Sequence, residues 1–200
     1  PEFIFTLSNN GTGEASRNLH NWARNYQLKD GQGDRMTLLN NWENTYFTFD
    51  EELLGKLMKE AKHLGVDMFL LDDGWFGNKH PRNDDHAGLG DWEAMKSKLP
   101  GGIPALVEKA KEAGVKFGIW IEPEMVNPQS DLFEAHPDWA IHYPNRETYY
   151  YRNQLVLDLS NPKVQDFVFG VVDKIMTENP DVAFFKWDCN SPITNIYSPY

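Results

Sequence analysis

Four short, mostly apolar runs alternate with three helical patterns between residues 36 and 188, and this alternation limits the fold more than any other feature. Strands are expected at 36–42, 66–71, 115–121 and 182–188. Helices are expected between them, at 50–64, 103–113 and 161–178. Largely apolar strands suit a sheet that is covered on both faces, and a helix between successive strands allows them to run parallel. The pattern therefore predicts an α/β domain with a parallel sheet.

Signals at both ends support the expected helix at 50–64. Asp50 can accept a hydrogen bond from a free N–H group of the first turn, and Glu51 and Glu52 lie where the helix dipole favours negative charge. Gly65 follows the last turn, where glycine commonly ends a helix.

A separate segment precedes this domain. A short strand is expected at 2–7, a turn at 9–11, a helix at 13–26 and a loop at 30–34. The boundary is expected between Asp34 and Arg35, which divides the chain into residues 1–34 and 35–200. A start at Pro1 and an end at Tyr200 are typical of a piece of a longer protein.

Composition argues against several classes of partner. The net charge of -11 disfavours nucleic acid and anionic membranes. No apolar run reaches the roughly 18 residues of a membrane-spanning helix, and no signal peptide opens the chain. A single cysteine, Cys189, rules out an intramolecular disulfide and fits a reducing compartment, so a cytoplasmic location is expected.

Carboxylates and tryptophans gather where the expected strands end. The ends read Asn-Asn-Trp-Glu at 40–43, Asp-Asp-Gly-Trp-Phe at 72–76, Trp-Ile-Glu-Pro-Glu at 120–124 and Lys-Trp-Asp at 186–188. Long loops follow the second and third strands, at 74–100 and 123–154. Parallel α/β folds place their sites at the carboxyl ends of the strands, so one site at this edge is expected.

Lys186 and Asp188 are the strongest candidates for chemistry. The strand period of two places Phe184, Lys186 and Asp188 on one face. A neighbouring ammonium keeps a carboxylate ionised, as a carboxylate nucleophile requires. A buried structural ion pair would give the same pattern.

Asp72 and Asp73 are adjacent, so on a strand they point to opposite faces and are not expected to share a proton. Ionised carboxylates accept hydrogen bonds strongly, which suits the binding of ligand hydroxyls. A loop-opening turn before Gly74 is the alternative. Arg152 follows three tyrosines and can either stack at the surface or fold back to pair with a carboxylate.

No metal or cofactor is expected. His80 and His86 are six residues apart, which matches no common zinc spacing, and both are interpreted as surface residues. Glycine-rich phosphate loops are absent from the sequence. Cys189 has no evident histidine partner, so it is expected to line the site or pack rather than act as a nucleophile.

Together the motifs resemble glycoside hydrolase family 36, the α-galactosidases of bacterial and fungal type. The matching stretches occur in the family's order, at 41–43, 71–77, 117–125, 157–162 and 186–190. The resemblance implies a (β/α)₈ barrel of which this chain holds strands 1–4, preceded in residues 1–34 by the end of a β-rich domain and a connecting helix. It also implies retaining hydrolysis of terminal α-linked galactose, from small galactosides such as melibiose and raffinose-type oligosaccharides, through a covalent galactosyl-aspartate. A homo-oligomer of the full-length protein is compatible with it.

The resemblance also implies roles for particular residues. Asp188 takes the position of the nucleophile. The residues expected to bind the sugar are Asp72 and Asp73 through its hydroxyls, Lys186 and Arg152 beside the nucleophile, Trp120 and Trp42 along the subsite and rim, and Cys189 and Asn190 behind the nucleophile. The acid/base of the family is an aspartate on a later strand, whereas Glu122 and Glu124 match a family motif without that role. The 200-residue piece alone is therefore expected to be inactive, and prone to aggregation because a partial barrel exposes strand edges.

Three alternatives stay open. An α-galactosyltransferase that builds raffinose-type sugars would share the covalent intermediate, although Trp187 resembles the hydrolases, and product analysis with a sugar acceptor separates the two. A non-catalytic galactose-binding protein would form no adduct on Asp188. A carboxylate–metal hydrolase would lose activity on chelation.

Overall fold

The computed structural model describes residues 3–194 and 196–200. The chain separates into two compact units, Pro1–Met36 and Thr37–Tyr200. In the first unit, helix α1 (Thr12–Trp22) continues as the π-helical turn η1 (Ala23–Gln27), so the helix expected at 13–26 is confirmed. The strand expected at 2–7 is wrong for residues 3–7, which belong to no strand in the described part of the chain, and Glu2 lies outside the described residues.

A four-stranded parallel sheet organises the second unit. Its strands are β1 (Leu38–Asn40), β2 (Met68–Leu71), β3 (Lys116–Ile121) and β6 (Val182–Trp187), in the order β1-β2-β3-β6. All three strand pairs are parallel, as predicted. The first strand is shorter than expected, because the chain turns at Asn41 and begins the short helix α2 (Trp42–Thr45). Asp188 follows β6, yet its N–H still donates to the Ile121 carbonyl at 2.9 Å. The pairing of β6 with β3 therefore continues as far as Asp188.

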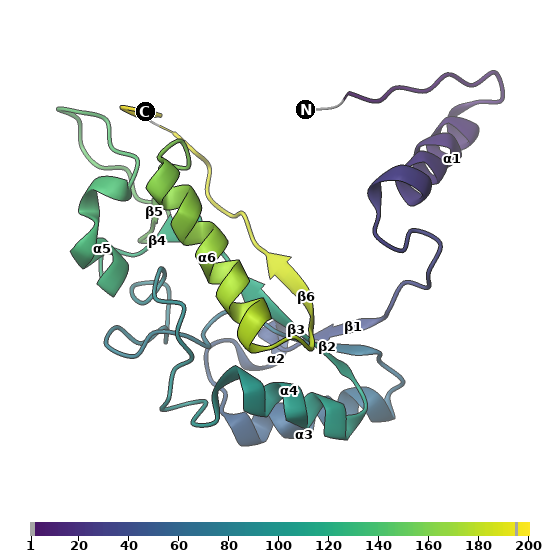
Figure 1. The fold of residues 1–200 in the computed structure, drawn as a ribbon, viewed down its shortest axis with the longest axis horizontal. Coiled ribbons are helices and arrows are strands. Elements are labelled where there is room, and N and C mark those ends of the chain that lie inside the picture. Colours follow the sequence, from purple (N-terminus) through teal and green to yellow (C-terminus); the bar gives the residue numbers. More distant parts are fainter. Residues whose placement is uncertain (1–2, 195) are drawn as a thin grey trace. The chain divides into compact units, whose positions relative to one another are not determined.

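The three connecting helices begin and end close to the expected residues. They are α3 (Glu51–His63), α4 (Gly102–Ala113) and α6 (Pro162–Glu178), and α3 and α4 lie side by side (Figure 1). The Asp50 side chain accepts from the Leu53 N–H at 2.8 Å, which confirms the cap predicted from sequence. Gly114 ends α4 with a φ of 81°, a conformation that glycine adopts without strain.

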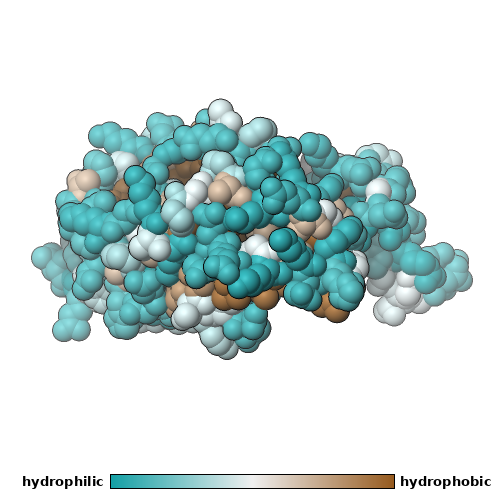
Figure 2. Space-filling view, turned by 90° about the horizontal axis from the view of Figure 1, so that it is seen from below, coloured by the Kyte–Doolittle hydropathy of each residue, from teal (hydrophilic) through white to brown (hydrophobic). Residues whose placement is uncertain are grey.

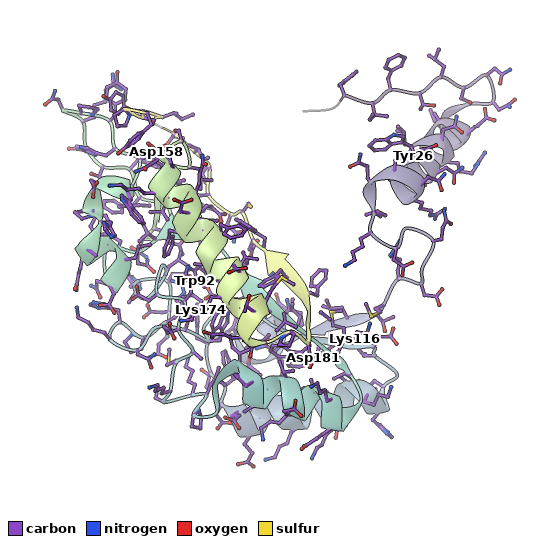
Figure 3. All side chains as sticks on the ribbon, in the orientation of Figure 1. Tyr26, Trp92, Lys116, Asp158, Lys174 and Asp181 are labelled. Atoms are coloured by element: carbon purple, nitrogen blue, oxygen red, sulfur yellow. The ribbon has the colours of Figure 1, made fainter. Side chains whose placement is uncertain are left out.

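The main core lies between the sheet and these helices. β2 is buried throughout and β3 is buried from Phe117 onward, which explains why both strands read as continuous apolar runs. Leu54 of α3, Leu106 of α4 and Ile175 of α6 pack in the same apolar cluster as β3. Near the end of α6, Lys174 pairs with Glu93 close to Trp92, and this contact joins the helix to the loop after β2 (Figure 3).

The segment after β3 is more ordered than the long loop expected there. It contains β4 (Met125–Val126) and β5 (Leu155–Val156) as an antiparallel pair, the helix α5 (Asp131–Ala135) and the 3₁₀ turn η2 (Pro137–Trp139). A second apolar cluster that includes Trp139 and Val164 fixes this segment against the start of α6. Strands of two residues are too short to show a period in the sequence.

The outer surface is largely hydrophilic, with apolar side chains in separate patches on the face drawn in Figure 2. Phe184 and Trp187 on β6, an outer strand of this sheet, are among the exposed aromatic residues. Among the described residues, none of the helices has the length and apolar character needed to cross a membrane.

Candidate active site

Side chains from the ends of all four parallel strands line one hollow of about 190 Å³. The lining residues are Trp42, Asp72, Asp73, Trp120, Arg152, Lys186, Asp188 and Asn190. Every one of them was predicted from the sequence, so the structure brings together eight of the nine predicted site residues. Cys189 is the ninth and does not line the hollow.

Asp188 is held in its ionised form. Its Oδ2 accepts a hydrogen bond from Trp120 Nε1 at 3.1 Å and lies 3.7 Å from Lys186 Nζ. Burial alone would raise the pKa of Asp188, but the hydrogen bonds from Trp120 and Asn190 and the charge of Lys186 outweigh it and lower the pKa. The carboxylate is therefore charged and ready to act as a nucleophile or to bind a cation.

Lys186 links the second and fourth strands of the sheet across the hollow. Its Nζ donates to Asp72 Oδ2 at 2.7 Å, while it also faces Asp188. Asp72 accepts a further hydrogen bond from Asn40 Nδ2, and its own N–H donates to Asn41 Oδ1 at 2.8 Å. The first strand end therefore orients Asp72, and one ammonium neutralises two carboxylates that would otherwise repel each other.

Asp73 has a different cation, Arg82, which is completely buried. Arg82 donates to both carboxylate oxygens, with Nε 3.0 Å from Oδ1 and Nη2 2.8 Å from Oδ2. Its Nη1 donates to Asn127 Oδ1 at 3.0 Å. Burial raises the pKa of Asp73, and the charge of Arg82 opposes that rise. Asp72 and Asp73 line the same hollow but contact separate cations, so they do not form a dyad that shares one proton.

Arg82 was not predicted from the sequence, although it is the most deeply buried charge at the site. It lies in the loop at 74–100, where nothing in the local sequence distinguishes it from a solvated arginine. The only signal is the expected cost of burying Asp73, which predicts a cation nearby but not which one.

Arg152 pairs with a carboxylate at the pocket, one of the two arrangements expected for it. Its Nη2 lies 2.9 Å from Asp85 Oδ1 and its Nε lies 3.2 Å from Asp85 Oδ2. Asp85 also lies 3.3 Å from Arg82 Nη2, so charges alternate in sign from Asp73 through Arg82 and Asp85 to Arg152. Such a row holds one wall of the hollow in a fixed arrangement.

Two tryptophans line the hollow from different environments. Trp120 is buried and stacks on Phe76, with ring centroids 6.0 Å apart and planes 4° apart. Trp42 begins α2 and meets the edges of Tyr46 and Phe47. Trp120 is rigid because aromatic neighbours surround it, which suits a group that also orients Asp188.

A family model described as Melibiase matches residues 1–200. The chain belongs to this family. It is 41% identical over 100% of its length to a protein named probable alpha-galactosidase G from Emericella nidulans, and covers 28% of that protein. It is 40% identical over 99% of its length to alpha-galactosidase AgaA from Geobacillus stearothermophilus, and covers 27% of it.

Solved structures agree with this assignment to the Melibiase family. A GH36 AgaA variant from Geobacillus stearothermophilus bound to 1-deoxygalactonojirimycin matches 96% of this chain with a TM-score of 0.90 and 39% identity, over 26% of its own chain. A second AgaA variant, bound to raffinose, matches 94% of this chain with a TM-score of 0.88 and 39% identity, over 26% of its own chain. The resemblance to family 36 is confirmed, and so is the predicted α/β fold. The chain covers only part of the barrel.

Cys189 is where the structure corrects the prediction for this Melibiase site. Its side chain is exposed and interacts with Glu124 rather than lining the hollow with Asp188. Successive residues of an extended chain point to opposite sides, so a residue next to Asp188 is directed away from the space that Asp188 faces. Partial burial and then the nearby carboxylates, with Glu124 first, raise the pKa of the Cys189 thiol to about 11.

A slow reaction of Cys189 with alkylating reagents is expected from this environment. At pH 8, a pKa of about 11 rather than 9 leaves about a hundredfold less thiolate, and the higher intrinsic nucleophilicity of the more basic thiolate offsets about tenfold of that loss. Iodoacetamide should therefore react with Cys189 about tenfold more slowly than it reacts with the reference thiol N-acetylcysteine. Mass spectrometry of the peptide that contains Cys189 follows the reaction. Glu124→Gln should accelerate the reaction, and a wild-type rate equal to that of N-acetylcysteine would contradict the prediction.

His80 and His86 do not reach the hollow. His80 Nε2 lies 2.8 Å from Glu134 Oε1 and close to Asp131, but Lys79 pairs with the same two carboxylates. The lysine already supplies the positive charge that a metal would bring to this cluster. His86 lies at the surface beside Asp84.

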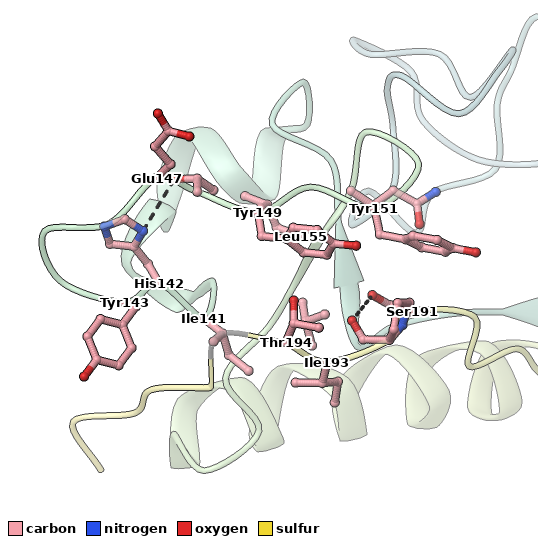
Figure 4. Close-up of a pocket in the computed structure, with 14 residues that line it drawn as sticks. Ile141, His142, Tyr143, Glu147, Tyr149, Tyr151, Leu155, Ser191, Ile193 and Thr194 are labelled. Carbon is pink, nitrogen blue, oxygen red and sulfur yellow. Dashed lines mark hydrogen bonds between the residues drawn. The ribbon is translucent and has the colours of Figure 1, made fainter.

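A second, smaller hollow lies beside the segment that follows Asn190 (Figure 4). Its volume of about 30 Å³ fits one or two water molecules but not a sugar ring. Tyr149 and Tyr151 lie along it, opposite Ile193 and Thr194 (Figure 4). The Gln154 amide also lines it and is buried without a hydrogen-bond partner among the described residues, which suits an ordered water.

Proposed function

We propose that the complete protein is an α-galactosidase that releases terminal α-linked galactose from small galactosides with retention of configuration. The observation that carries this proposal is the ionised Asp188 carboxylate, which Trp120 and Lys186 hold at a hollow lined by further carboxylates and tryptophans. The chain spans about a quarter of the length of the relatives it matches, whose names and bound sugars point to α-galactosides.

Binding is assigned to the walls of the hollow. Asp72 and Asp73 are acceptors for sugar hydroxyls, and the cations Lys186 and Arg82 orient them. Arg152 offers donors to the same sugar, and Asn190 lines the hollow beside it. Trp42 and Trp120 supply apolar surface for the faces of the ring.

The reaction proceeds in two displacements. A carboxylate oxygen of Asp188 attacks the anomeric carbon, and the bond from that carbon to the leaving-group oxygen breaks as a general acid protonates this oxygen. Water then attacks the galactosyl ester from the opposite side, loses a proton to the same group acting as base, and frees Asp188. The acid/base must lie about 5–5.5 Å from the nucleophile. We assign that role to no residue of this chain.

Hydrolysis of a panel of aryl glycosides by the complete gene product tests this function. We expect turnover of the α-galactoside, with the α-glucoside, β-galactoside and N-acetyl-α-galactosaminide cleaved at least about a hundredfold more slowly. The α-glucoside and the N-acetyl sugar change the hydroxyls that the buried acceptors bind. In the β-galactoside the leaving group lies on the side from which Asp188 attacks. Initial release of α-galactose, followed by NMR, is the expected stereochemical result. Preferred cleavage of another sugar would overturn the assignment of Asp72 and Asp73 to galactose.

A further inference from the structure

Glu122 holds a residue of the site without facing the hollow itself. It is the first residue after β3, is 1% exposed, and is not one of the described residues that line the hollow. Its Oε1 accepts hydrogen bonds from the backbone N–H and from the side-chain Nδ2 of Asn190, each at 3.1 Å. Two bonds between the same pair of residues fix both the backbone and the side chain of Asn190.

Asn190 in turn lines the hollow together with Asp188, the proposed nucleophile. Its amide, together with Trp120 and Lys186, lowers the pKa of Asp188. The amide nitrogen carries two hydrogens, and Glu122 accepts one of them, so the second N–H can donate toward the hollow. An ionised carboxylate can only accept, and Glu122 therefore selects the orientation in which the nitrogen of Asn190, rather than its oxygen, points inward.

We propose that Glu122 is a positioning residue that acts through Asn190 to orient a hydrogen bond onto Asp188. The proposal rests on the proposed function, because it takes Asp188 as the nucleophile. Glu122 touches neither the substrate nor the reacting atoms. Its contribution is to keep the Asn190 amide from rotating, which would leave the Asp188 carboxylate less well held.

The charged groups around Glu122 agree with this role. Burial, and then the carboxylates Glu124, Asp188 and Asp73, raise the pKa of Glu122 to about 7. Arg152 is a nearby cation that interacts electrostatically with Glu122. Protonation would give Glu122 an O–H that competes for the oxygen of Asn190, so the orientation is expected to loosen as pH falls through about 7.

A double-mutant cycle in the complete protein tests the proposal. We expect Glu122→Leu and Asn190→Ala each to lower kcat on an aryl α-galactoside about 10- to 100-fold, with a much smaller change in KM. The double variant should be no slower than Asn190→Ala alone, because Glu122 acts only through that residue. Losses that multiply in the double variant would show that Glu122 acts independently and would overturn the proposal.

Glu122→Gln is a milder substitution that tests the proposal if the Glu122→Leu variant does not fold. The Gln carbonyl can still accept both hydrogen bonds, so kcat should stay within about threefold of wild type and should lose any titration near pH 7. A fall in kcat as large as that of Asn190→Ala, at an unchanged melting temperature, would contradict the proposal.

Crystal structures of the wild type and Glu122→Leu separate this inference from the proposed function. If the wild type cleaves no α-galactoside, the proposed function fails, yet the orientation of Asn190 can still be compared. A rotated Asn190 in the leucine variant supports the positioning role, and an unchanged Asn190 overturns it.

Discussion

Asp188→Asn is expected to lower kcat on an aryl α-galactoside by at least about 10³-fold in the complete protein, which corresponds to about 4 kcal/mol of transition-state stabilisation. The amide is nearly the same size as the carboxylate, so the fold and the donors Trp120 and Lys186 stay in place. An amide oxygen is a poor nucleophile, and the covalent intermediate cannot form at a useful rate. Steady-state kinetics and mass spectrometry of the enzyme with a slow substrate measure both effects.

Asp181→Asn is the matched control. It makes the same change beside the other end of β6, where Asp181 pairs with Lys111 at the surface. Exposed pairs contribute about 0–1 kcal/mol, so this variant should keep wild-type kcat.

Azide should rescue Asp188→Gly and give the β-galactosyl azide, because the anion attacks from the side that the carboxylate had occupied. Undiminished activity of Asp188→Asn would remove the assignment of the nucleophile.

Local patterns in the sequence predicted the frame of this molecule well. The parallel sheet and the helix caps follow from short-range rules, because the run from Met68 to Leu71 and the cap at Asp50 each carry their own signal. The gathering of Asp72, Trp120 and Asp188 at one edge follows from parallel topology alone. The roles given to these residues came from the family resemblance and stay predictions.

Contacts that depend on the third dimension could not be predicted in this way. Arg82 reaches Asp73 from a loop without a repeating pattern, and Glu122 meets Asn190 across 68 residues. The resemblance placed Cys189 behind the nucleophile, whereas its exposed side chain interacts with Glu124. For Arg82 and Glu122 the deciding question is which side chain satisfies a buried polar group, and the answer requires coordinates.

Arg82→Met is expected to destabilise the complete protein by about 3–5 kcal/mol, because it leaves one member of a buried ion pair without its partner. The substitution keeps an apolar stem of similar length but removes every guanidinium donor of Arg82 from Asp73, whose buried carboxylate then loses the cation that contacts it. The substitution also removes the hydrogen bond from Arg82 Nη1 to Asn127 Oδ1. Thermal melting and urea unfolding followed by tryptophan fluorescence measure the change.

The effect of Arg82→Met should depend on pH in a defined direction. Burial already raises the pKa of Asp73, and loss of Arg82 removes the charge that opposes this rise. The folded variant then binds a proton more tightly than the unfolded chain, so its stability falls as pH rises from the unfolded pKa through the raised folded pKa. The difference in the free energy of unfolding between wild type and Arg82→Met should therefore widen with increasing pH over this window and then level off.

Two further variants decide whether the buried charge is the cause. Asp73→Asn combined with Arg82→Met removes the unpaired charge, so it should be more stable than Arg82→Met at neutral pH and lose most of the pH dependence. Arg146→Met makes the same change at the surface, where Arg146 lies over Tyr143, and should change stability by less than about 0.5 kcal/mol. If the double variant is as unstable as Arg82→Met at every pH, the cost comes from lost packing of the guanidinium and not from the charge on Asp73.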